Sequence, residues 1–155
     1  MTYDSREDTR KHIEEVKGTL KVIRDELLKR GLKHDASKLV DPEKAVFDDA
    51  TPKLEKLTYG SKEYKKQLKS MDKALKHHYE SNRHHPEHHK NGVKDMNLVD
   101  LVEMFCDWVA ATKRHADGDI YASITINKER FDLPPMLAKI FENTAKDTFG
   151  MKGKK

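Results

Sequence analysis

The sequence lacks the residue patterns of several common protein classes. Cys106 is the only cysteine, which excludes an internal disulfide and a cysteine-rich zinc site. No segment approaches the roughly 18 consecutive apolar residues of a membrane-spanning helix, and the charged N-terminal segment has no signal-peptide core. We therefore predict a cytoplasmic protein that does not cross a membrane. Because Cys106 lies in an apolar run, we expect a small buried side chain rather than a nucleophile.

Glycine and proline are also scarce, with seven and five among 155 residues, and the sequence contains no internal repeat or long linker. A chain of this length is sufficient for one domain with its own core. We predict a single domain at residues 1–150 and a basic disordered tail at residues 151–155. Much of the net charge of +4 lies in this tail, so nucleic-acid binding ranks last among the functions considered.

Hydrophobic periodicity predicts an all-α fold in which the helices form a compact bundle. We expect helices near residues 8–30, 61–82, 96–118, 119–131 and 133–150, with a loop at residues 50–60. Gly31 is typical of a helix end, Ser61 of a helix cap, and "DPE" at residues 41–43 of a helix start. Residues 96–118 are apolar around most of a helical wheel, which predicts a helix in the middle of the bundle.

Histidine, in contrast, is abundant: six of the nine histidines lie between positions 77 and 89. Outside that cluster, the residues that could bind a metal are His12, His34, Asp35 and Asp107. Two imidazoles and two carboxylates form a mixed nitrogen and oxygen donor set that suits a divalent Mn, Fe, Co, Ni or Zn ion. Gly31 and Ser37 flank the His-Asp pair and permit a backbone turn there. Taken alone, the pair could equally be a helix end followed by a cap.

The order His, His-Asp, Asp, with "HDASK" in place of "HDIGK", resembles the HD-domain metal-dependent phosphohydrolases. The short gap between His12 and His34 is closer to the oxygenase branch, such as myo-inositol oxygenase and its phosphonate-cleaving relatives. More narrowly, nearly the whole chain resembles an uncharacterised family of small phage and bacterial HD-like proteins, a domain of unknown function. The phrases that carry this resemblance are "LLKRGLKHDASKL", "GSKEYK", "HHYESNRHHPEHH", "LVEMFCDWVAATKRHADGDI" and "INKERF". It implies an HD-like helical bundle but no established substrate.

The resemblance also implies a second metal, because some HD proteins hold one with extra histidines in the place of "HHYESNRHHPEHH". We select His78, which continues an inward-facing apolar stripe, and His85, which precedes a proline. His77, His84 and His88 remain open as alternatives, and Asp35 would bridge the two ions. Adventitious metal binding at the surface is the competing interpretation of this histidine-rich segment.

Lys38, Asp35 and Glu103 are the predicted catalytic residues. Lys38 matches the lysine of the family's "HDxxK" pattern, so the resemblance assigns it to the phosphate, as Arg83 and Arg114 could also be. Asp100 and Glu103 share the narrow polar arc of their helix with Asp107. Both are candidates for general-base work or for a contact with a metal-binding histidine.

The predicted function is hydrolysis of a nucleotide or similar small phosphate ester by a metal-activated water, with one or two ions. The first alternative is an HD-type di-iron oxygenase. The second is a non-catalytic phage or host interaction protein whose metal is structural. The oligomeric state stays open.

Overall fold

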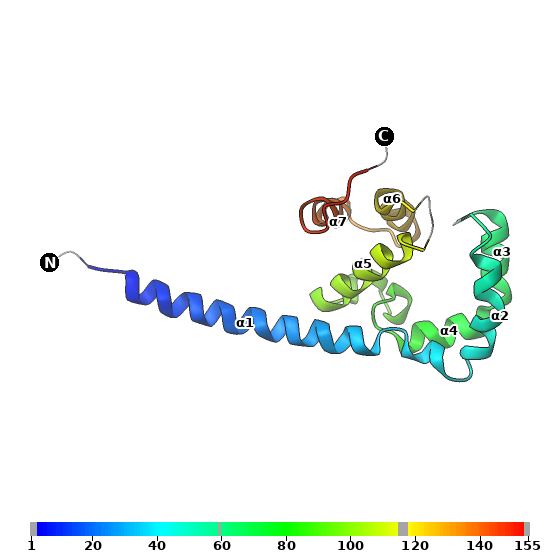
Figure 1. The fold of residues 1–155 in the computed structure, drawn as a ribbon, viewed down its shortest axis with the longest axis horizontal. Helices are drawn as coiled ribbons and strands as arrows, with labels where there is room; N and C mark the ends of the chain where they lie inside the picture. Colours follow the sequence, from blue (N-terminus) through cyan, green and yellow to red (C-terminus); the bar gives the residue numbers. More distant parts are fainter. Residues whose placement is uncertain (1–2, 59, 115–117, 154–155) are drawn as a thin grey trace. The chain divides into compact units, whose positions relative to one another are not determined.

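The computed structural model describes residues 3–58, 60–114 and 118–153, and all regular structure in these residues is helical (Figure 1). The all-α prediction is therefore confirmed. The chain divides into two units, residues 1–34 and 35–155, which we describe one at a time. The elements, with η for short 3₁₀ helices, are α1 (Arg6–Lys33), η1 (Ala36–Leu39), α2 (Lys44–Leu54), α3 (Lys62–Ser70), α4 (Asp72–Ser81), η2 (Pro86–His88), η3 (Gly92–Asp95), α5 (Leu98–Thr112), α6 (Ile120–Arg130) and α7 (Pro135–Asp147).

The first unit contains α1, which Figure 1 shows as one uninterrupted helix. Acidic residues in its first turn and basic residues in its last turn suit the helix dipole. The helix continues through Gly31 to Lys33, so the predicted end at Gly31 is wrong. The chain leaves the helical conformation at His34, whose ψ is 125°.

The second unit begins with a tight turn at Asp35. This residue has a φ of 55°, a left-handed conformation that aspartate adopts more readily than most residues. The Lys38 N–H donates to the Asp35 carbonyl at 2.9 Å and closes the turn. Asp35 itself therefore makes the turn that we had assigned to Gly31 and Ser37.

Helix α2 starts within one residue of the predicted position, with Glu43 as its N-terminal cap residue. It then continues through residues 50–54, which we had predicted as loop. Pro52 lies in the last turn of this helix, where its missing N–H removes a single hydrogen bond and does not stop the helix earlier.

The predicted helix at 61–82 is two helices, α3 and α4. Ser61 caps α3 as expected, because its side chain accepts a hydrogen bond from the Tyr64 N–H at 3.1 Å. The break falls at Met71, which is 2% exposed and anchors the junction in the interior. The inward-facing stripe continues along α4 and ends, as predicted, on the buried side chain of His78.

The hydrophobic core lies among α5, α6 and α7. Its buried members are Met104, Phe105, Trp108, Val109, Ile120, Ile124, Leu133, Ala138, Phe141 and Ala145. The rings of Phe105 and Phe141 stack in parallel with centroids 4.9 Å apart, and the Trp108 ring meets Phe141 edge-on. The prediction that α5 is a central helix is confirmed for this unit. Every described helix is too short or too polar to cross a lipid bilayer.

One prediction at the edge of this core is wrong. Cys106 is exposed, not buried, because it lies on the side of α5 away from the core. Partial burial and the nearby carboxylates of Glu103 and Asp107 raise the pKa of its thiol. At the start of the segment predicted as a tail, Met151 packs against the core and its carbonyl accepts a hydrogen bond from the Tyr121 hydroxyl. Residues 154 and 155 lie outside the described chain.

The segment between α4 and α5, which carries four of the nine histidines, is held against α5 by Asp100. This buried carboxylate accepts two hydrogen bonds from the Arg83 guanidinium, at 3.2 and 2.9 Å. It also completes a capping box with Asn97 at the start of α5. Asp100 and Arg83 therefore pair with each other.

Two histidines of the same segment bond to the backbone and stabilise its conformation. The rings of His88 and His89 bond to the backbone carbonyls of Tyr79 and Arg83, at 3.1 and 2.9 Å. The Arg130 guanidinium of α6 donates to Glu87 at 2.6 Å and to the Tyr79 hydroxyl at 3.3 Å. These contacts hold the segment against α4 and α6.

Replacing Asp100 with alanine tests whether its carboxylate holds the histidine-rich segment against α5. The D100A variant loses the helix cap and a buried partner of Arg83, so the free energy of unfolding should fall by about 2–3 kcal/mol. Urea denaturation followed by circular dichroism measures the change. D48A is the matched control, because Asp48 pairs with Lys44 on the open surface, and it should unfold like the wild type. Equal midpoints for D100A and D48A would contradict the structural role of Asp100.

Candidate functional site

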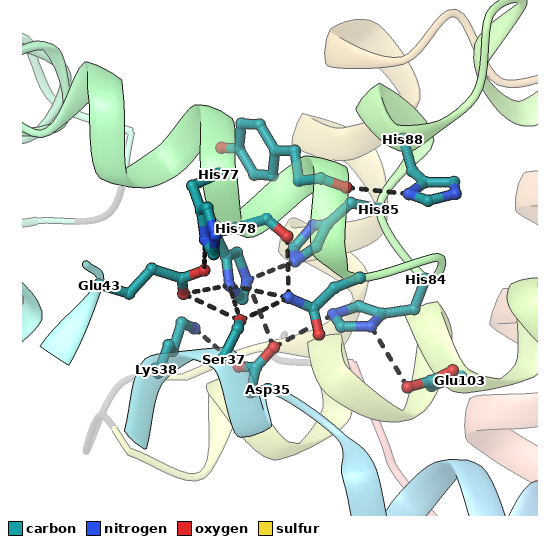
Figure 2. Close-up of polar contacts among 12 residues, drawn as sticks. Asp35, Ser37, Lys38, Glu43, His77, His78, His84, His85, His88 and Glu103 are labelled. Atoms are coloured by element: carbon teal, nitrogen blue, oxygen red, sulfur yellow. Dashed lines mark hydrogen bonds and ion pairs between the residues drawn. The ribbon is translucent and has the colours of Figure 1, made fainter. Parts of the chain in front are cut away.

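Four side chains of the second unit converge on one point (Figure 2). They are Asp35 from the turn before η1, His78 from α4, and His84 and His85 from the segment after α4. Asp35 Oδ1 lies 3.3 Å from His78 Nε2 and 3.5 Å from His84 Nε2. His85 Nε2 lies 2.9 Å from His78 Nε2. One donor atom from each of the four lies within 4.8 Å of the others.

These spacings fit a single metal ion. Ligand atoms bound roughly 2.1 Å from a common ion lie about 3 to 4.2 Å apart, depending on the geometry. The distances from Asp35 Oδ1 to His78 and His84 fall in this range. Three imidazoles and one carboxylate form a donor set that transition metals favour over Mg²⁺ or Ca²⁺.

Glu43 fixes the orientation of His78. Its side chain is completely buried, and its Oε2 lies 2.9 Å from His78 Nδ1. An ionised carboxylate accepts hydrogen bonds and cannot donate them, so the hydrogen of this bond belongs to His78 Nδ1. The lone pair of His78 is then on Nε2, the atom that faces Asp35.

Ser37 and Asn82 complete the network around this pair (Figure 2). The Ser37 hydroxyl donates to Glu43 Oε2 at 3.0 Å and accepts from the Asn82 amide at 2.8 Å. Asn82 also donates to the backbone carbonyl of His78 at 2.8 Å. The network links η1, α2 and the end of α4, so the orientation of His78 is fixed by three elements.

Glu103 performs the same role for His84. Its Oε1 lies 3.2 Å from His84 Nδ1, and both side chains are buried. A proton on Nδ1, directed at this carboxylate, leaves the His84 lone pair on Nε2, which faces Asp35 Oδ1. The geometry thus favours one of the two roles predicted for Glu103, the contact with a metal-binding histidine.

His85 is neutral over the whole physiological range. Burial, together with His84 and His78, lowers the pKa of its imidazole to about 2. The neutral ring can donate its Nε2–H to His78 Nε2 or, in the other tautomer, direct a lone pair into the cluster. A neutral imidazole is the form that binds metals.

Lys38 contacts Asp35 directly. Its ammonium donates to Asp35 Oδ2 at 2.7 Å, which leaves Oδ1 directed at the histidines. The ammonium also lies 4.9 Å from the centre of the Phe47 ring. The predicted role of Lys38 is to contact a phosphate. In this structure Lys38 would have to make that contact while it stays paired with Asp35.

A cavity of about 570 Å³ adjoins the cluster within the second unit. Its lining includes Lys38, His84, His85, Asp107, Trp108 and Arg114. A carboxylate oxygen of Asp107 lies within 4.8 Å of a ring nitrogen of His84. The cavity therefore gives a small molecule a route to His84 and His85.

The sequence matches a family of unknown function, DUF5662, over residues 1–147. The chain belongs to the DUF5662 family. No curated protein and no solved structure matches it. Membership of DUF5662 assigns no activity, so the resemblance to HD-domain phosphohydrolases remains a prediction.

The structure of this DUF5662 member brings together several of the predicted ligands. Asp35, His78 and His85 meet in the cluster, and His84, which we had left as an alternative, joins them. His12 lies near the start of α1 and His34 caps its end, so both belong to the first unit. Their part in the ligand set remains a prediction. His77 and His88 point elsewhere, to Glu43 and to a backbone carbonyl.

Glu43 is the residue of this candidate site that sequence reasoning missed. It lies directly after a proline at a helix start, and acidic residues are common there for reasons of capping alone. No periodic pattern links it to His78, which is 35 positions away. Only the fold of η1 and α2 against α4 brings the two together.

The depressed pKa of His85 predicts acid sensitivity of the metal-free protein. The unfolded chain protonates this histidine below about pH 6.5 while the folded chain keeps it neutral. This contribution to stability is therefore complete above pH 6.5 and is lost as the pH falls towards 2. Between pH 6.5 and pH 5 the loss should be up to roughly 2 kcal/mol.

Urea titrations at both pH values, with a chelator present, measure this loss. The H85Q variant cannot take up the proton, so its stability should fall less between the same two pH values. An identical fall in H85Q and the wild type would contradict a buried, neutral His85.

Proposed function

We propose that this protein is a metal-dependent phosphohydrolase of the HD type that acts on a nucleotide or similar small phosphate ester. The observation that supports the proposal is the convergence of Asp35, His78, His84 and His85 beside a cavity. With neutral rings, Asp35 Oδ1 and the Nε2 atoms of His78 and His84 are three hydrogen-bond acceptors that face one another at short range. Such an arrangement is repulsive by itself and becomes attractive around a cation.

The protein's own residues prepare this site. Glu43 and Glu103 hold two of the imidazoles with their Nε2 atoms inward, and Lys38 holds Asp35. A divalent ion bound by this set supplies a water of lowered pKa and positive charge for a phosphoryl oxygen. Mn, Fe, Co and Ni fit the proposal better than Zn, because four protein donors complete a tetrahedral zinc site and leave two positions on a six-coordinate ion.

The adjoining cavity supplies the substrate side of the proposal. Arg114 and Lys38 line it and provide positive charge for a phosphate, and Asp107 lies beside His84 as a candidate base or further ligand. Trp108 contributes an aromatic side chain to the wall. A small ester with one anionic end and a flat organic part suits this lining.

An iron-dependent oxygenase is the second candidate. The donor set of three imidazoles and one carboxylate includes the two histidines and one carboxylate that non-haem iron enzymes use. Oxygen consumption by iron-loaded protein, without release of phosphate, would favour this candidate over the hydrolase.

The hydrolase is tested with purified protein supplied with Mn²⁺ or Co²⁺ and a panel of nucleotides and simple phosphate esters. We expect phosphate release from at least one compound, and a fall of 100-fold or more in D35N and in H84A, because each removes a ligand. The control is H88Q, whose histidine bonds to the backbone outside the cluster and which should keep wild-type turnover. Full turnover in D35N and H84A would contradict the proposal.

A further inference from the structure

Glu43 has an unusual set of partners. It is 0% exposed, and its two oxygens contact two consecutive histidines of α4. Oε1 lies 2.6 Å from His77 Nδ1, and Oε2 lies 2.9 Å from His78 Nδ1 (Figure 2). The Ser37 hydroxyl also donates to Oε2, at 3.0 Å. One carboxylate is thus held by three donors from two elements.

We propose that Glu43 is the positioning residue of the metal site, acting by accepting hydrogen bonds from both His77 and His78. This inference rests on the proposed function only in its assumption that the cluster of Asp35, His78, His84 and His85 binds a metal. The contact with His78 sets its tautomer and makes Nε2 a stronger donor. The contact with His77 fixes the carboxylate itself.

The helical geometry explains why two consecutive histidines are used. Neighbouring side chains on an α-helix point about 100° apart, so only one of the pair can face the cluster. His78 is 2% exposed and faces inward, whereas the His77 side chain is 44% exposed. A carboxylate that bonds to both therefore fixes the rotation of α4 about its own axis, and with it the direction of the His78 ring.

A purely structural role for Glu43 makes a different prediction. Removal of a buried structural carboxylate lowers the stability of the metal-free protein, and the metal affinity of the molecules that stay folded is unchanged. A positioning role lowers the metal affinity of the folded protein. Measured together, the two quantities separate these roles.

The experiment uses the full chain and the E43Q variant, which keeps the size of the side chain and removes its charge. The dissociation constant for Co²⁺ is measured by competition with a chelator, and the visible absorption of bound Co²⁺ reports the ligand geometry. We expect E43Q to bind Co²⁺ 10- to 100-fold more weakly, with an altered absorption spectrum. Circular dichroism of the metal-free proteins gives the folded fraction.

E63Q is the matched control, because Glu63 is an exposed glutamate in the first turn of α3, and it should bind Co²⁺ like the wild type. H77Q loses one of the two imidazole contacts and should show a smaller loss of affinity than E43Q.

Wild-type affinity and spectrum in folded E43Q would overturn the inference. Absence of Co²⁺ binding by the wild type would overturn both the inference and the proposed function. Weaker binding by E43Q in a protein that hydrolyses no phosphate ester would support the inference and refute the hydrolase alone.

Discussion

The close approach of Asp35 to the ring nitrogens of His78 and His84 is the constraint around which this site is organised. When both rings are neutral, a carboxylate oxygen and two imidazole lone pairs repel one another at 3.3 to 3.5 Å. The fold holds them there through partners on the far side of each group. Lys38 holds the other oxygen of Asp35, and Glu43 and Glu103 hold the other nitrogens of the two rings. Each acceptor is thus preorganised before any ligand arrives.

The rest of the second unit serves to keep these partners in place. The left-handed turn at Asp35 directs its carboxylate back towards α4, and the Ser37 and Asn82 network joins that turn to α2. On the other side, Asp100 anchors the histidine-rich segment to α5, the helix most deeply embedded in the core. Burial in this core of Trp108 and its neighbours makes α5 a fixed support for Glu103. The core therefore stabilises the site as well as the fold.

The sequence predicts the helices well where apolar side chains repeat with helical spacing, as in α5 and along α4 to His78. It predicts helix ends less well at Gly31, Met71 and Pro52, because tertiary packing decides whether a local signal stops a helix. For the site, composition indicates that several histidines share a role, but not which ones. His84 and His88 look alike in sequence. Only the packing of their segment against the neighbouring helices directs His84 into the cluster and His88 to a backbone carbonyl. Glu43 has no sequence signal at all, since its partners are distant in the chain.

The central claim is that Asp35, His78, His84 and His85 bind one cation together. Crystals of the protein grown with Mn²⁺, with anomalous diffraction measured near the metal absorption edge, test it most directly. The account predicts an anomalous peak within roughly 2.0–2.3 Å of Asp35 Oδ1 and of the Nε2 atoms of the three histidines. A well-ordered site with no peak, or a peak bound only by residues outside this cluster, would contradict it.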